Sequence, residues 1–169
     1  MLGAREVDSL DASAGIRALS EAIAMRAPAI FCIHDVGEGD ALVLATRFDR
    51  GYAYRGGQAL FWDASFAASE VLDRYLPATP LRPFIRRGLL QVNGMFNGRY
   101  VALIATEFDA ERAARVREVR FARTVLRSID GDAILFVKGL APKGTGFRDL
   151  GFSKIAGEEQ RAIYRRMTA

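Results

Sequence analysis

Only two side chains in this sequence of 169 residues are an imidazole or a thiol, the groups that serve as acid–base groups near neutral pH, thiolate nucleophiles or soft metal ligands. There is one histidine, His34, and one cysteine, Cys32, which excludes sites built on two histidines or two thiolates and any internal disulfide. His34 and Asp35 together could bind a metal or form an acid–base dyad. Neighbouring residues of a strand point to opposite faces, however, so we favour a structural or surface histidine. Cys32 lies in an apolar run and is expected to pack as a small hydrophobic side chain.

The basic residues are almost all arginine. Of 24 lysines and arginines only Lys138, Lys143 and Lys154 are lysine, and the net charge is +4. Arginine binds phosphate and carboxylate bidentately, so the composition allows an anionic partner. Arginines recur along residues 109–128, and such a stripe can bind a nucleic-acid backbone. The same spacing is typical of a solvated helix face, and no aromatic residues alternate with it, so we favour the solvated interpretation.

Helices and strands must position these side chains. Apolar residues at helical spacing predict a helix over 9–26, which ends before Pro28, and a longer helix over 109–128. The buried stripe expected on the longer helix is Ala113, Val116, Val119, Ala122 and Leu126. Apolar runs without alternation predict strands that are covered on both faces, at residues 29–33, 58–62 and 133–137.

Turn signals divide the remaining chain. Two apolar runs flank a loop that ends in Asn97-Gly98, which predicts a hairpin over residues 87–106. Residues 40–48 suit either a helix or a strand. The other segments are expected to be a turn-rich connection (51–57), a surface excursion with one helical turn near 67–75 (63–83), a loop rather than a phosphate-binding loop (139–151) and a short C-terminal helix (158–167).

Composition places the chain among ordinary globular proteins. Half of the residues are hydrophobic and 26% are charged, which excludes disordered and collagen-like classes. No run approaches the ~18 apolar residues of a membrane-spanning helix. The first eight residues lack the pattern of a secretory signal. We therefore expect a single domain over residues 1–169, located in the cytoplasm, without a membrane span.

Four segments, in order, resemble motifs of the endonuclease/exonuclease/phosphatase superfamily, whose members have the DNase I-like fold. Residues 28–36 resemble its strand ending in Leu-Gln-Glu-Val, and residues 56–60 its Gly-Gly-x-Ala-Leu strand entry. Residues 101–109 resemble its Val-x-Val-x-Asn-Thr-His-Leu-Asp strand, and residues 133–140 its Ile-Leu-x-Gly-Asp-x-Asn strand. The resemblance covers about residues 10–150. It implies an α/β (α+β) sandwich, in which two sheets pack face to face between helices.

The resemblance also implies which residues would do the chemistry. Members of the superfamily hydrolyse phosphodiesters or phosphomonoesters with a divalent metal, usually Mg²⁺. Asp35 stands where the metal-binding glutamate would be, as a remnant metal ligand, and Glu107 stands where a histidine would be. Lys138 and Leu140 occupy the positions of an aspartate and an asparagine. Glu107 would repel a phosphate oxyanion and Leu140 has no hydrogen-bonding group, so we expect no catalytic residue and no cofactor.

The same comparison implies missing strands. The chain is expected to lack the superfamily's opening strand, which carries an asparagine ligand, and its final strands, which carry a Ser-Asp-His motif. A sandwich without them would expose strand edges and apolar surface, so we expect self-association or another protein partner. Candidate residues of that surface are Phe84, Phe96, Phe147 and Phe152.

Three functional hypotheses follow. The first is a catalytically inactive domain that acts as a binding or structural subunit of an assembly. The second is a divergent Mg²⁺-dependent phosphodiesterase or nuclease, which would keep Asp35 and recruit Glu107 or Asp109 as ligands. The third is a nucleic-acid-binding module that uses the arginines of residues 109–128.

Overall fold

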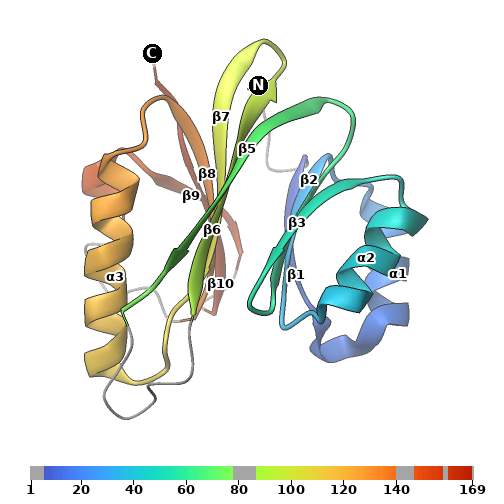
Figure 1. Ribbon diagram of the computed structural model, residues 1–169, viewed down its shortest axis with the longest axis horizontal. Coiled ribbons are helices and arrows are strands. Elements are labelled where there is room, and N and C mark those ends of the chain that lie inside the picture. The colour runs from blue at the N-terminus through green and yellow to red at the C-terminus, as the bar shows by residue number, and fades with distance from the viewer. Residues whose placement is uncertain (1–5, 78–86, 140–146, 158–159, 169) are drawn as a thin grey trace.

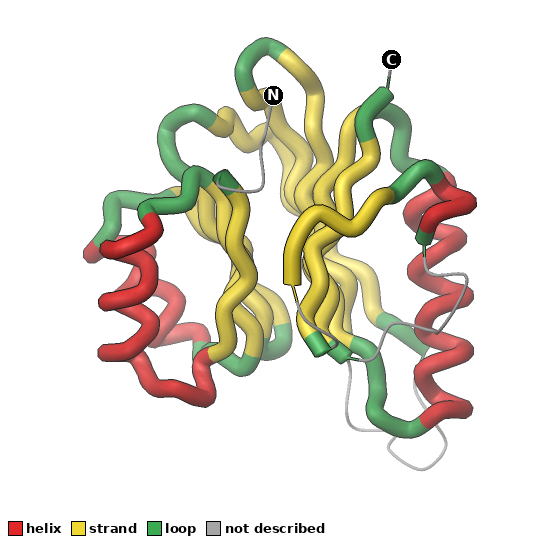
Figure 2. Tube along the Cα trace, turned by 180° about the vertical axis from the view of Figure 1, so that it is seen from behind, coloured by secondary structure: helices red, strands yellow, loops and turns green. Residues whose placement is uncertain are grey.

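The computed structural model describes residues 6–77, 87–139, 147–157 and 160–168. Two β-sheets pack face to face, with helices on both outer surfaces (Figures 1 and 2). The first sheet, of order β1-β2-β4-β3, contains β1 (Val7–Asp11), β2 (Ile30–His34), β3 (Gly51–Arg55) and β4 (Gln58–Trp62). The second sheet, of order β5-β6-β7-β8-β10-β9, contains β5 (Phe66–Tyr75), β6 (Gly88–Phe96), β7 (Arg99–Glu107), β8 (Asp132–Lys138), β9 (Ser153–Gly157) and β10 (Arg161–Arg166).

The helices lie outside the two sheets. The helices α1 (Gly15–Arg26) and α2 (Glu38–Arg47) cover the four-stranded sheet, and α3 (Arg112–Arg127) covers the six-stranded sheet (Figure 1). Two short 3₁₀ turns, η1 (Ala12–Ala14) and η2 (Arg148–Leu150), complete the described elements. This arrangement confirms the α+β sandwich that the sequence predicts.

The strand β2 shows how the apolar runs build the core. All five of its residues are buried. Ile30 and Cys32 belong to the core between the two sheets, whereas Phe31 and Ile33 belong to the core beneath α1 and α2. A strand with apolar neighbours on both faces has no solvated side, which explains why its sequence does not alternate.

Several predicted elements are confirmed with small changes of boundary. The hairpin consists of β6 and β7, joined at Asn97-Gly98, with Phe96 opposite Arg99. Asn97 has a φ of 49°, in the left-handed region that an Asn-Gly turn requires. The ambiguous residues 40–48 lie mostly in α2, and the predicted strands at 58–62 and 133–137 are β4 and the centre of β8.

Other expectations were wrong. The chain does have an opening strand, because β1 precedes α1 and pairs in parallel with β2. The turn-rich connection after Arg50 is the strand β3, the excursion after Asp63 contains the long strand β5, and the predicted C-terminal helix is the strand β10. Each of these segments forms a strand because it makes hydrogen bonds to a partner strand. The local periodicity of the sequence does not show such pairing.

The buried stripe of α3 is rotated from the predicted one. Val116 is 44% exposed and Ala113 is also exposed, whereas Val119, Ala122 and Leu126 are buried as expected. Glu118 is buried as well. The three described phenylalanines assigned to an exposed surface are instead core residues (Phe96, Phe147 and Phe152), and Phe84 and Leu140 lie outside the described residues. Within the described part of the chain, no helix is long and apolar enough to cross a membrane.

Candidate functional site

Ionisable side chains from both sheets meet where four strands end. Asp11 is the last residue of β1 and lies beside His34, the last residue of β2. Glu107 and Lys138 end β7 and β8 and are also in register with each other. These strand ends lie at the lower edge of the two sheets in Figure 1. Parallel pairing within each sheet therefore brings together residues that are far apart in the sequence.

Lys138 is the centre of this cluster. Its Nζ donates a hydrogen bond to the carboxylate of Asp35 and lies 3.2 Å from Oδ2 of Asp11. Both carboxylates come from the four-stranded sheet, whereas Lys138 belongs to the six-stranded sheet, so this ion-pair network connects the sheets. Asp35 follows β2 directly, with a φ of 57°, and its side chain is about half exposed. Lys138 and Asp11 are largely covered.

The charges of the cluster stabilise one another. Partial burial of Lys138 opposes its charged form, but the hydrogen bond to Asp35 and the charge of Glu107 raise its pKa above the ordinary value. Burial likewise opposes the charge of Asp11. The hydrogen bonds from Ser13 and Lys138, together with the charge of Lys138, outweigh burial and lower the Asp11 pKa to about 2. Burial raises the Glu107 pKa, despite the attraction of Lys138.

His34 lies beneath this cluster and is fully buried. Its Nε2 is 3.6 Å from Sγ of Cys32, and its Nδ1 has no hydrogen-bond partner among the described residues. Burial and the nearby charge of Lys138 lower the His34 pKa to about 4, so the ring is neutral at pH 7. Burial also raises the pKa of Cys32, which keeps its thiol protonated.

The residues present do not fit a divalent cation as they are arranged. Mg²⁺ requires several oxygen ligands around one point, and Asp11, Asp35 and Glu107 would supply carboxylates at this end of the sheets. The ammonium group of Lys138, however, already lies between Asp11 and Asp35. Among the residues that the structure describes, no group of three or more His, Cys, Asp or Glu side chains could hold a metal ion.

The other carboxylate considered as a ligand, Asp109, belongs to a separate cluster. Its side chain forms an ion pair with Arg87, and its backbone N–H donates to Oε2 of Glu118 at 2.6 Å. Arg87 lies 3.6 Å from Oε1 of Glu118. This second cluster fixes the start of α3 against β6, so the structure does not bring Asp109 together with Asp35.

Sequence reasoning missed the role of Asp11. Its carboxylate accepts a hydrogen bond from Ser13 N at 2.8 Å, at the start of η1. The resemblance identified the position of Lys138 but not its bond to Asp35. The hydrogen bond from Ser13 is local, whereas the contact of Asp11 with Lys138 depends on the packing of one sheet against the other.

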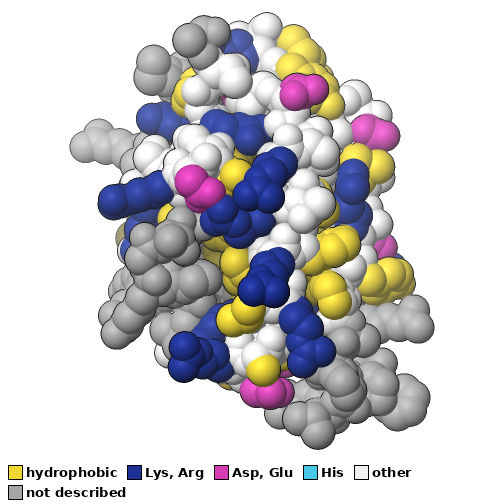
Figure 3. Space-filling model, turned by 90° about the vertical axis from the view of Figure 1, so that its left-hand side faces the viewer, with side chains coloured by type: hydrophobic (Ala, Val, Ile, Leu, Met, Phe, Trp, Pro, Cys, Tyr) yellow, Lys and Arg dark blue, Asp and Glu magenta, His cyan; other side chains and the backbone are white. Residues whose placement is uncertain are grey.

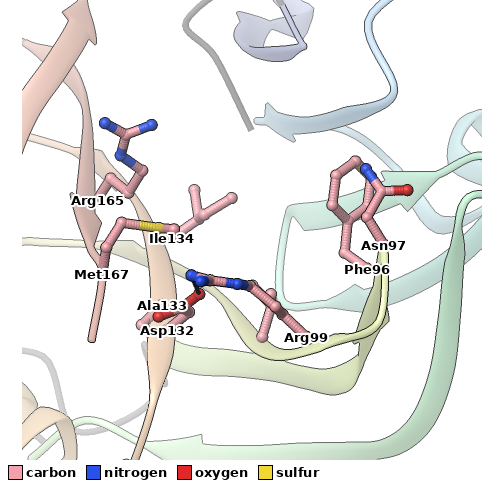
Figure 4. A pocket seen from close by; sticks show the side chains of 9 residues that line it. Phe96, Asn97, Arg99, Asp132, Ala133, Ile134, Arg165 and Met167 are labelled. Atoms are coloured by element: carbon pink, nitrogen blue, oxygen red, sulfur yellow. Dashed lines mark hydrogen bonds and ion pairs between the residues drawn. The ribbon is translucent and has the colours of Figure 1, made fainter. Parts of the chain in front are cut away.

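A cavity of about 270 Å³ opens at the opposite end of the six-stranded sheet. Val101, Ala133 and Ile134 contribute its apolar surface. Arg99 reaches across to Asp132, at 3.5 Å (Figure 4). This cavity is separate from the Lys138 cluster, because Arg99 and Asp132 begin the strands that Glu107 and Lys138 end.

Comparison with known proteins relates this geometry to a fold. No protein-family model and no curated protein matches the chain. Among solved structures, a mannosyl-6-phosphatase of Bacteroides thetaiotaomicron has a TM-score of 0.75 at 13% identity, with 95% of this chain and 84% of that one covered. An endonuclease/exonuclease/phosphatase family protein of the same species has a TM-score of 0.74 at 13% identity, with 94% and 79% covered. D. rerio TDP2, in complex with a single-strand DNA product, has a TM-score of 0.71 at 13% identity, with 95% and 82% covered.

These similarities agree with two sheets packed face to face between helices. Identities near 13% establish a shared fold and carry no activity from one protein to another. The chain therefore has the DNase I-like fold of the endonuclease/exonuclease/phosphatase proteins.

Proposed function

We propose that this chain is a catalytically inactive protein with the endonuclease/exonuclease/phosphatase fold, and that it works as a binding or structural subunit of an assembly. One observation carries the proposal: the ammonium group of Lys138 lies between the carboxylates of Asp11 and Asp35. A lysine side chain can neutralise carboxylates there. It cannot bind a water molecule as a Lewis acid or lower the pKa of that water as a metal does.

The surrounding residues support the same conclusion. Hydrolysis of a phosphoester requires a group that activates water and groups that stabilise negative charge on the phosphoryl oxygens. His34 is neutral, buried and in contact with Cys32, so it is not placed to take up a proton from water. Glu107 adds negative charge beside the cluster, where an anionic substrate would be repelled.

The strand edges support a protein partner. Within the described part of the chain, β1 pairs only with β2 and is therefore an edge of the four-stranded sheet. Its outer N–H and C=O groups can accept another strand. Analytical sedimentation at micromolar protein concentration would test self-association. A monomer at that concentration would argue against self-association, and the partner would then have to be a different protein.

The alternative of a divergent Mg²⁺-dependent phosphodiesterase also has an observation in its favour. Three carboxylates, those of Asp11, Asp35 and Glu107, remain near one another at the strand ends. Under this alternative, a metal ion would have to displace Lys138. The two functions therefore differ in whether the unaltered protein binds Mg²⁺.

Calorimetric titration with Mg²⁺ and Mn²⁺, together with hydrolysis of bis(4-nitrophenyl) phosphate, distinguishes them. We expect neither binding nor hydrolysis by the unaltered chain. Lys138→Ala frees Asp11 and Asp35 but adds no ligand, and no three ligand side chains of the described residues could surround one ion, so neither this variant nor the exposed control Lys154→Ala should bind Mg²⁺ or Mn²⁺. Metal-dependent hydrolysis by the unaltered chain that is lost in Asp35→Ala would refute the proposal.

A further inference from the structure

The exposed face of α3 concentrates the positive charge of the protein. This helix contains six arginines and one glutamate, whereas the net charge of the whole chain is +4. The rest of the chain is therefore slightly acidic. Figure 3 looks onto this side of the molecule and shows basic side chains spread over it, with few acidic ones between them. A general excess of arginine would not gather the charge on a single helix.

The acidic groups near α3 neutralise only part of this charge. Glu118 is buried and accepts a hydrogen bond from the backbone of Asp109. Asp149 forms an ion pair with Arg123 and attracts Arg127 from a longer distance. Four exposed arginines make no hydrogen bond or ion pair within the part of the chain that the structure describes, and we call them the α3 arginine face: Arg112, Arg117, Arg120 and Arg127.

This pattern differs from that of a helix face that serves solubility. Exposed helix faces commonly place glutamate three or four residues from lysine or arginine, because such pairs stabilise the helix and like charges at that spacing destabilise it. The α3 arginine face lacks these pairs. Its unpaired guanidinium groups are available to an external anion, and the fork of an arginine matches the oxygens of a phosphate.

We propose that the α3 arginine face binds the phosphate backbone of double-helical nucleic acid, without selecting a base sequence. From Arg112 to Arg127 the face extends about 22 Å, at about 1.5 Å per residue. A duplex carries one negative charge per ~1.7 Å of its axis, so several phosphates lie within reach. Contacts to phosphates provide affinity and carry no sequence information, which is why no base selection is expected.

Two other anionic partners fit this face less well. Single-stranded nucleic acid is bound by stacking its bases on exposed aromatic rings, and the only aromatic side chain of α3, Phe121, packs against the core. An anionic membrane surface would need apolar side chains between the arginines for insertion. The only large exposed hydrophobic residue of α3 is Val116.

The proposal does not depend on the Lys138 cluster. The helix α3 covers the outer surface of the six-stranded sheet (Figure 1), whereas Lys138 contacts Asp11 and Asp35 of the four-stranded side. Nucleic-acid binding at α3 and metal binding or hydrolysis at the Lys138 cluster can therefore be measured separately.

Fluorescence anisotropy with a labelled duplex of about 20 base pairs and mixed sequence tests the proposal. We expect a Kd in the micromolar range at about 50 mM KCl. Four phosphate contacts predict that log K falls with log[KCl] with a slope of about −3.6. The variant Arg120→Gln/Arg127→Gln should weaken binding at least tenfold and reduce that slope by about 2. Both residues are exposed and unpaired, so the fold should be unaffected, which circular dichroism checks.

A matched control removes the same charge from the other side of the molecule. Arg17→Gln/Arg47→Gln alters exposed arginines of α1 and α2, and binding should change less than twofold. An equal loss in this control would show that net charge, not the α3 arginine face, is responsible. Absence of duplex binding at about 50 mM KCl would overturn the proposal. Tighter binding to a single strand, or to vesicles containing phosphatidylserine, would also overturn it.

Discussion

Acidification should destabilise this protein through His34. The ordinary pKa of histidine is 6.5, and burial together with Lys138 lowers the His34 pKa in the folded state to about 4. Between these values the unfolded chain binds a proton that the folded chain does not, so the free energy of unfolding rises with pH in that range. The contribution of His34 to stability is complete above pH 6.5 and is lost as the pH falls toward 4.

The size of the effect follows from the shift. A pKa difference of about 2.5 corresponds to about 3 kcal/mol, of which about 2.5 kcal/mol lies between pH 7.5 and pH 4.5. Other charged groups near His34 are Asp11, Asp35, Lys138 and Arg161. The Asp11 pKa of about 2 makes its contribution disappear only below about pH 4, outside this range.

Urea unfolding of the original protein and of His34→Gln at both pH values measures this effect. The glutamine side chain is polar but does not titrate. On acidification, the free energy of unfolding of the variant should therefore fall by about 2.5 kcal/mol less than that of the original protein. Glu107 and Glu118 have raised pKa values and act in the opposite direction, since they favour the folded state at low pH. They are present in both proteins and cancel in the difference. Equal pH dependence of the two proteins would refute the reasoning about His34.

Three further predictions follow from other contacts. Lys138→Ala should lower the free energy of unfolding by about 1–2 kcal/mol, a value reduced for partial exposure, as measured by thermal melting; an unchanged melting temperature would contradict this. Arg87→Ala should lower the free energy of unfolding, measured with urea, by about 3 kcal/mol, because Asp109 and Glu118 stay buried without their cation. A decrease no larger than that caused by replacing an exposed arginine of α1 would contradict this. Cys32 is fully buried, so Ellman's reagent should label it only as fast as the protein unfolds, and rapid labelling of the folded protein would contradict its position in β2.

The sequence by itself determined the architecture to a considerable extent. Uninterrupted apolar runs such as Ala29–Ile33 indicate strands that are covered on both faces, and a sandwich between helices is the arrangement that covers them. Asn97-Gly98 predicts its hairpin because only a few residue types adopt the left-handed conformations of that turn. These features depend on neighbours in the chain, so they can be read without the fold.

The tertiary structure decided where the short strands and the charged groups belong. In isolation, Val7–Asp11 fits a helix start and Arg161–Arg166 fits an amphipathic helix, but each becomes a strand because a distant strand, β2 or β8, completes its backbone hydrogen bonds. Likewise, Lys138 meets Asp35 only because the two sheets pack with these strand ends together. A contact across 103 positions of the chain is determined by packing between sheets, which local sequence preferences do not encode.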